Sequence, residues 1–148
     1  MKKTLIIAFT ISVLSMQSCI HKTDSEMVPE EVLTALNAKF KDYKKLKWEK
    51  ENEEEWEAEF VMDEKEYSAN FLTNGDWKET EYEIKGSDLP DKILYILNEN
   101  FSDYKIEECE IVLSNEGTSY EMEIKTNKEE FEILIDSKGN LTKQENED

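Results

Sequence analysis

The chain contains no arginine, one histidine, two cysteines, two prolines and four glycines among its 148 residues. Its positive charge comes only from lysine, and 18 basic residues stand against 36 acidic ones, which gives a formal net charge of −18. A protein that binds nucleic acid needs a basic surface that replaces the counterions of the phosphate backbone. The composition therefore argues against nucleic acid as a partner.

The scarcity of histidine and cysteine limits the chemistry that the chain can perform. The single histidine, His21, lies two residues after Cys19, so we expect neither a histidine-based catalytic triad nor an imidazole metal cluster. Cys109 alternates with Ile111 and Leu113, which favours a buried structural thiol. Carboxylates are so numerous that none stands out as a general acid or base. We predict that the protein is not an enzyme and has no cofactor.

The N-terminal segment has the pattern of an export signal. Two lysines precede an apolar run over 5–14, and Ser18 stands directly before Cys19. This pattern predicts a lipoprotein signal peptide over 1–18, then Cys19 as the lipid anchor at the start of a polar tether over 19–27. The alternative is an ordinary secreted protein in which Cys19 is incidental.

The predicted anchor sets the expected location. Cleavage removes two lysines and no acid, which takes the formal net charge from −18 to −20, and anionic headgroups repel such a chain. The lipid would therefore be the only contact with the membrane. Ile20 stands where an aspartate would signal retention at the inner membrane, so we expect the outer membrane, with the domain facing the periplasm or the cell surface. Once Cys19 is acylated, Cys109 has no partner for a disulfide.

The rest of the chain repeats itself. Residues 28–43 align with 89–104 at an offset of 61, and residues 56–60 align with 120–124 at an offset of 64. A repeat of this kind indicates that the fold is built from two similar units. The predicted organisation after the tether is a first repeat over 28–85, a second repeat over 89–143 and an acidic tail over 144–148.

Each repeat begins with a helix signal and continues with strand signals. Pro29 and Pro90 are placed as first-turn prolines, each followed by acidic residues and by apolar residues at helical spacing. Period-two alternation then predicts successive strands, joined by short turns that contain Gly75 and Gly139. The sequence therefore predicts an α+β fold: a tandem repeat of one helix plus about four antiparallel strands, with the helices packed on one face of the sheet.

The other sheet face is predicted to be open, charged and mainly acidic, which suits a protein or peptide partner that is basic. The candidate contacts include three aromatic anchors, for which packing in the core is the alternative. The candidate binding residues are Trp48, Trp56, Trp77, Glu57, Glu59, Glu121 and Glu123.

Calcium is the alternative ligand, because hard cations prefer clustered oxygen atoms and the chain carries a large excess of carboxylates. The segment 136–140 is superficially similar to a calcium loop. It lacks the acidic spacing and the terminal bidentate glutamate of such loops, and Lys138 lies among the would-be ligands. A hairpin turn is the simpler interpretation.

Several short motifs recur in a fixed order: the proline-started helix, the strands at 47–49, 56–60 and 67–71, and the turns at Gly75 and Gly139. In these motifs the sequence resembles the beta-lactamase-inhibitor-like, PepSY-like family of exported bacterial proteins. The resemblance covers 28–143 and implies tandem helix-plus-sheet units, a periplasmic or surface location, and a binding or inhibitory role without catalytic residues. The second unit departs from the first because Cys109 replaces the tryptophan at position 48 and three extra residues lie near 115–117.

Overall fold

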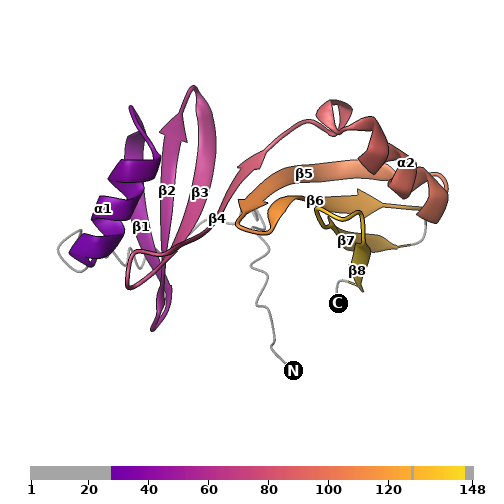
Figure 1. The fold of residues 1–148 in the computed structure, drawn as a ribbon. Coiled ribbons are helices and arrows are strands. Elements are labelled where there is room, and N and C mark those ends of the chain that lie inside the picture. The colour runs from indigo at the N-terminus through magenta and orange to yellow at the C-terminus, as the bar shows by residue number, and fades with distance from the viewer. Residues whose placement is uncertain (1–27, 128, 146–148) are drawn as a thin grey trace, which may run out of the picture.

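The computed structural model describes residues 28–127 and 129–145 (Figure 1). The predicted signal peptide, Cys19, the tether and residues 146–148 of the predicted tail lie outside the described residues. In chain order the elements are α1 (Glu30–Lys39), β1 (Lys44–Asn52), β2 (Glu55–Met62), β3 (Lys65–Leu72), β4 (Trp77–Glu83), the short 3-10 helix η2 (Gly86–Asp88), α2 (Asp91–Asn100), β5 (Lys105–Ser114), β6 (Gly117–Lys125), β7 (Glu130–Ile135) and β8 (Leu141–Glu145).

Both α-helices begin directly after a proline, as predicted. Pro29 and Pro90 occupy the position before the first helical residue, each with a φ of −58°. Acidic residues in the first turn of each helix stabilise its positive end. Each helix ends where a phenylalanine, Phe40 or Phe101, adopts an extended conformation and donates its backbone N–H to a leucine carbonyl four residues earlier.

The eight strands form one antiparallel sheet whose strand order is the chain order. The predicted fold class, an α+β tandem repeat of helix-plus-sheet units, is therefore wrong: the architecture is mostly a single sheet that carries two ten-residue helices. The cause is the pairing of β4 with β5, which runs from Glu79↔Ser114 to Glu83↔Glu110 without a register shift. Alternation in the sequence shows that a strand has a buried face, but it does not show which strand lies along its edge.

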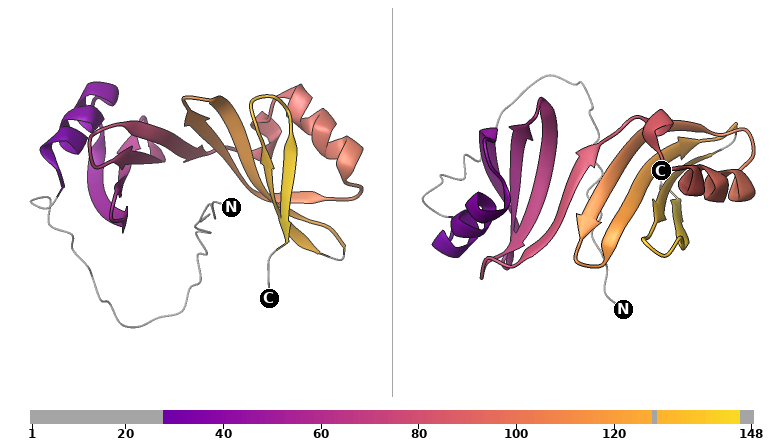
Figure 2. Two further views of the ribbon diagram at one scale, coloured as in Figure 1. Left: turned by 60° about the horizontal axis from the view of Figure 1, so that its bottom comes forward. Right: turned by 45° about the horizontal axis from the view of Figure 1, so that its top comes forward.

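The strand registers show which side chains share the side of the sheet that carries α1 and α2, which we call the helix face. Directly paired residues project to the same side, and the pairs Ala58↔Ala69, Ala69↔Thr80 and Thr80↔Leu113 lead from the strands beneath α1 across to β5. Alternation along β5 then places Cys109 on the same side, beneath α2. The two helices thus cover one side of the sheet at its opposite ends, as both views in Figure 2 show.

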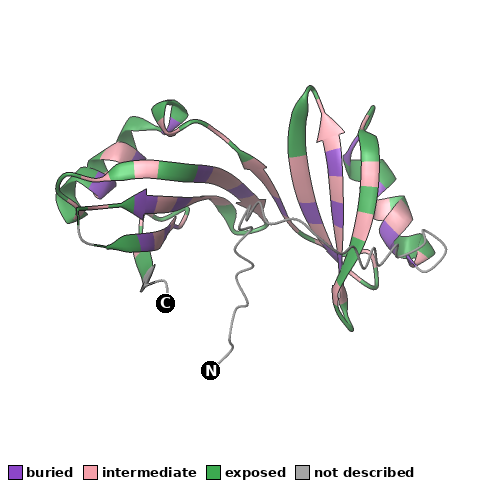
Figure 3. Ribbon diagram, turned by 180° about the vertical axis from the view of Figure 1, so that it is seen from behind, coloured by how far each residue is buried: buried purple, intermediate pink, exposed green. Residues whose placement is uncertain are grey.

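Each helix has its own hydrophobic core, and no residue belongs to both. Rings meet in each core: the centroids of Phe40 and Phe60 lie 4.8 Å apart, and those of Phe101 and Phe131 lie 6.0 Å apart. Figure 3 shows the resulting alternation of burial along the strands. The first core contains Val28, Val32, Leu36, Phe40, Trp56, Ala58, Phe60, Ala69 and Phe71. The second contains Leu89, Ile93, Leu97, Cys109, Met122, Ile124, Phe131, Ile133 and Ile135.

The turn between β3 and β4 requires its glycine. Gly75 has a φ of +87°, and a Cβ atom at this position would lie 2.8 Å from the backbone oxygen of Glu31. Glycine therefore provides both the left-handed conformation and the close approach of this turn to the start of α1. Gly139 also has a positive φ, of +93°, which agrees with the predicted turns.

Helix α2 offers a direct test of the packing. Leu97 is completely buried in the second core, whereas Tyr95 on the same helix is 64% exposed. We expect Leu97→Ala to lower the free energy of unfolding by about 3 kcal/mol, because it removes buried surface and leaves a cavity. Tyr95→Ala should change that energy by less than about 0.5 kcal/mol. Urea denaturation of the two variants checks this, and equal losses would contradict the assigned packing.

Candidate functional site: an acidic sheet face

The side of the sheet opposite the helices is rich in glutamates, and ten of them lie toward its centre on β2 and on β4 to β7. Their common orientation follows from the strand registers. Each glutamate is directly paired with a residue that points away from α1 and α2, or lies two residues from such a residue along its strand. We call this surface the acidic face. Its glutamates are Glu57, Glu59, Glu79, Glu81, Glu83, Glu108, Glu110, Glu121, Glu123 and Glu132.

Several of these glutamates stand directly opposite one another on neighbouring strands. Glu110 pairs with Glu83 on one side and with Glu121 on the other, and Glu123 is flanked in the same way by Glu108 and Glu132. Like charges at directly opposed positions destabilise a sheet. The acidic face is thus a concentration of negative charge that folding alone does not favour.

Within the described part of the chain, ion pairs lie around the margins of this face. Lys47 Nζ lies 3.2 Å from a carboxylate oxygen of Glu59, and Lys125 of β6 pairs with Glu130 of β7. Lys78 pairs at 2.7 Å with Glu55, the first residue of β2. Hydrogen bonds from Lys78 and Asn70 to Glu55 outweigh burial and lower its pKa. The lysines therefore lie at the margins of the face and leave its centre acidic.

Partial burial and mutual repulsion raise the pKa values of the central carboxyl groups. Burial, followed by the charges of Glu79, Glu110 and Glu57, raises the pKa of Glu81 to about 7. Burial, followed by a hydrogen bond with Glu132, raises the pKa of Glu121 to about 8. These two carboxyl groups therefore hold a proton for part of the time at neutral pH.

Burial is also the largest cause of the raised pKa values of three further carboxyl groups on this face. Neighbouring glutamates add to the effect in each case, although Lys78 opposes it at one residue and Lys125 at another. These three residues are Glu79, Glu110 and Glu123.

The structure separates the predicted binding residues by face. Glu57, Glu59, Glu121 and Glu123 lie on the acidic face. The three tryptophans lie on the opposite side of the sheet. Trp56 is 3% exposed within the first core, Trp48 pairs with Ala58 and contacts Phe71, and the ring of Trp77 lies 3.3 Å beneath Lys39 Nζ. The structure thus does not bring the aromatic and acidic candidates together.

Sequence reasoning missed the centre of the acidic face. Glu79, Glu81 and Glu83 alternate along β4, and Glu108 and Glu110 alternate along β5, so each strand shows a charged side in its own sequence. That alternation is the feature of the sequence that indicates a charged side on each strand. Only the pairing of β4 with β5 brings the two charged rows together.

The loop considered for calcium uses its carboxylate within the turn. Asp136 accepts hydrogen bonds from the backbone N–H groups of Lys138 and Asn140, at 2.9 and 2.8 Å, and from the side-chain amide of Asn140 at 2.8 Å. The bonds from Asn140 are the main cause of its lowered pKa. This arrangement is a hairpin turn.

A different group of carboxylates lies close enough together to hold a cation. Glu49, Glu51 and Glu57 each offer one oxygen, and these oxygens lie within 4.8 Å of one another. Burial, followed by the charge of Glu57, raises the pKa of Glu51 to about 7. The group lies where β1 and β2 meet, at the edge of the acidic face.

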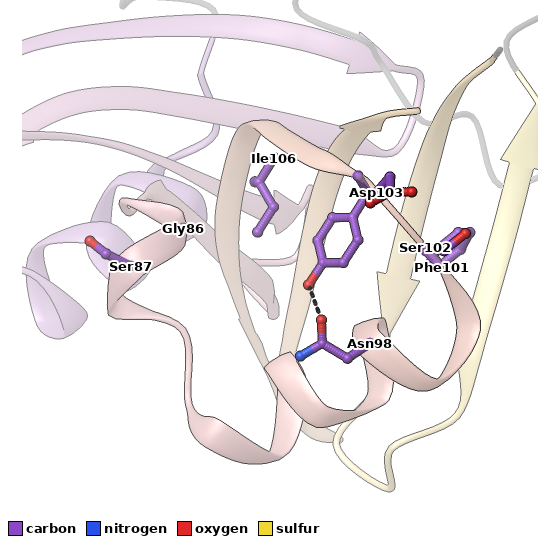
Figure 4. Close-up of a pocket in the computed structure, with 8 residues that line it drawn as sticks. Gly86, Ser87, Asn98, Phe101, Ser102, Asp103 and Ile106 are labelled. Carbon is purple, nitrogen blue, oxygen red and sulfur yellow. Dashed lines mark hydrogen bonds between the residues drawn. The ribbon is translucent and has the colours of Figure 1, made fainter. Parts of the chain in front are cut away.

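A shallow hollow lies beside the C-terminal end of α2 (Figure 4). Its volume is about 760 Å3, and the hydroxyl of Tyr104 donates a hydrogen bond to Asn98 across it at 3.2 Å. None of its lining residues is a histidine, lysine or cysteine. The lining residues are Gly86, Ser87, Asn98, Phe101, Ser102, Asp103, Tyr104 and Ile106.

Cys109 is buried, as predicted, and 2% exposed. Burial, followed by the charges of Glu110 and Glu83, raises the pKa of its thiol to about 12. The thiol therefore stays protonated at neutral pH and is a poor nucleophile.

The central carboxyl groups should make stability depend on pH. Their pKa values are higher in the folded than in the unfolded chain, so the folded state binds more protons between about pH 4.5 and 8, and stability falls as pH rises through this range. Glu121→Gln should reduce this fall by about 2 kcal/mol. The exposed helix variant Glu99→Gln should leave it unchanged. Urea unfolding at pH 5 to 8 measures the slope, and a rise in stability with pH would contradict the assignment.

None of the described helices is long and apolar enough to span a membrane.

Comparisons with known proteins place the fold. A family model described as "Putative beta-lactamase-inhibitor-like, PepSY-like" matches residues 54–143. Among solved structures, a BLIP-like protein from Bacteroides fragilis shares 18% identity at a TM-score of 0.69, over 81% of this chain and 88% of that chain. Proteins described as putative periplasmic proteins from Bacteroides eggerthii share 18% identity at a TM-score of 0.70, over 80% of this chain and 88% of that one.

A DUF2874 family protein from Bacteroides uniformis has the same TM-score of 0.70 at 15% identity, over 79% of this chain and 88% of that chain. At these identities the structural likeness shows the fold. No curated protein matches the chain. The family match covers more than half of the chain and confirms the resemblance that the sequence motifs indicated. The chain belongs to the beta-lactamase-inhibitor-like, PepSY-like family.

Proposed function

We propose that this protein is a non-enzymatic, lipid-anchored binding module of the bacterial envelope, which holds a basic protein or peptide on its acidic face. The observation that carries the proposal is the excess of carboxylates there: of the ten glutamates, one forms an ion pair with a described lysine. An uncovered sheet face with this charge complements a basic surface and steers it toward binding. The inhibitor-like family description fits a module of this type.

A role without catalysis is supported by the chemistry of the described residues. The one histidine of the chain precedes them, and the pKa of the Cys109 thiol, at about 12, is far too high for a nucleophile at neutral pH. The carboxyl groups whose pKa values are raised lie on a broad sheet face. General acid and base catalysis, in contrast, needs a site that encloses its substrate.

The proposed location rests on the N-terminal sequence and on the relatives. Cys19 would carry the lipid, and residues 20–27 would set the folded part away from the membrane. One similar solved structure is described as periplasmic. We propose attachment to the outer membrane, with the acidic face exposed to proteins of the periplasm or the cell surface.

In-cell crosslinking followed by mass spectrometry tests the binding proposal. The crosslinked, tagged protein should recover one dominant basic partner. In a parallel purification without crosslinker, recovery of that partner should fall about tenfold from low to high salt, because counterions screen the acidic face. Glu57→Lys together with Glu121→Lys should cause a similar loss, since both substitutions place a positive charge on this face.

The control is Glu99→Lys, which makes one such substitution at an exposed position on α2. It should leave recovery unchanged. Circular dichroism confirms that each variant is folded. Recovery that is indifferent to salt and to the paired substitutions on the acidic face would remove this face as the binding surface.

We propose calcium binding as the second candidate function, because three carboxylate oxygens from Glu49, Glu51 and Glu57 converge within 4.8 Å. Calorimetric titration should give heat at millimolar calcium that is larger at pH 8 than at pH 6, since Glu51, whose pKa is about 7, must release its proton to bind. Glu51→Gln should abolish the heat, and Glu53→Gln in the neighbouring turn should preserve it. A flat titration of the unchanged protein would end this candidate.

A further inference from the structure

The two halves of the molecule meet along a narrow seam. The first core lies beneath α1 and the second beneath α2, and the residues on the helix face between them belong to neither core. Tyr82, Ile111 and Leu113 occupy this position and are only half-buried. The buried side chains at the junction are Thr80 on the helix face and Val112 on the opposite face, and neither belongs to a core. Each core therefore packs within its own half.

The junction consists mainly of the ladder between β4 and β5. Five residue pairs form it, from Glu79↔Ser114 to Glu83↔Glu110. One further backbone hydrogen bond, from the N–H of Ile84 to the carbonyl of Cys109 at 2.9 Å, extends it. The covalent connection between the two strands runs through η2 and α2, so loss of this ladder would leave both halves linked and each with its core.

Negative charge lines this seam on the side away from the helices. Glu79, Glu81 and Glu83 project from β4, and Glu110 projects from β5 directly opposite Glu83. Within the described residues, no ion pair reaches any of these four carboxylates. Ionisation therefore places repulsion across the ladder that joins the two halves.

The groups around Glu81 are almost all acidic or neutral. Its paired residues on β3 and β5 are Ser68 and Val112, neither of which can supply charge. Both helices lie on the opposite side of the sheet. The charged groups on this side from the surrounding strands are Glu57, Glu59 and Lys47 from β1 and β2, Glu66 from β3, Glu79, Glu83 and Lys78 from β4, Glu108 and Glu110 from β5, and Glu121 and Glu123 from β6.

We propose that the β4–β5 seam is a pH-sensitive hinge, which is closed when the carboxyl groups beside it carry protons and opens locally when they ionise. The geometry supplies both requirements of such a device: two halves that keep separate cores, and a junction lined by like charges. The hinge is a property of the free protein and does not depend on whether a partner binds the acidic face.

The direction of the effect follows from the carboxyl groups. Burial and neighbouring glutamates raise the pKa of Glu81 to about 7, and burial is the main cause of the raised pKa of Glu110. A carboxyl group whose pKa is raised in the closed state favours that state at low pH and loses this effect as pH rises through its pKa. The hinge should thus be closed near pH 6 and should open more often near pH 8.

Hydrogen exchange measured by NMR tests the hinge at the level of single amides. After correction for intrinsic exchange, the opening equilibrium of amides bonded between β4 and β5 should rise about tenfold from pH 6 to pH 8. The opening equilibrium of amides in the β2–β3 ladder, which lies within the first half, should rise by much less. This contrast within the unchanged protein needs no substitution. The β6–β7 ladder is not used for comparison, because Glu121 and Glu132 titrate there.

Variants then assign the effect to the seam. Glu81→Gln together with Glu110→Gln should remove the pH-dependent increase in opening of the β4–β5 ladder, because a glutamine side chain cannot ionise. Glu59→Gln, on the same face but paired with Lys47, should retain it. If the opening equilibrium rose equally in all ladders between pH 6 and pH 8, the protein would be losing stability as a whole, which would overturn the hinge. A rise in the opening equilibrium of the β4–β5 amides that persists in the double variant would also overturn it.

Discussion

The pairing of β4 with β5 is the interaction on which the rest of this structure depends. It joins the strands that follow α1 to the strands that follow α2, and it does so without a register shift. Because directly paired residues share a face, this one ladder aligns the apolar sides of both halves and, at the same time, aligns their charged sides. The helix face and the acidic face are two consequences of the same register.

The same ladder explains why the acidic face is unfavourable for folding and how it would serve the proposed binding function. Glutamates such as Glu83 and Glu110 stand opposite each other, and partial burial keeps some of their neighbours from full ionisation. Two separate cores stabilise the fold against this repulsion. An uncovered face that keeps unpaired charge at a cost in stability suits a surface whose countercharge comes from outside the molecule.

Local patterns in the sequence predicted the elements well, since each depends on a few adjacent residues. Pro29 and Pro90 mark the helix starts, the glycine turns adopt positive φ, and Cys109 is a buried thiol with a raised pKa. The fold class was wrong because the halves appeared as repeated helix-plus-sheet units, whereas their strands merge into one sheet. The tryptophans were candidates for binding because an aromatic side chain in a strand suits either a core or an interface. The register places Trp48, Trp56 and Trp77 on the helix face.

The sequence by itself determined the charge, the place of the one histidine in the chain, the positions of the helices and turns, and the family. These properties follow from composition and from contacts between residues that are near in the chain. The tertiary structure decided which strands pair, which face each tryptophan occupies, and where the glutamates of β4 and β5 meet. Such features depend on hydrogen bonds between residues far apart in the sequence, and the alternation within any one strand is compatible with more than one neighbour.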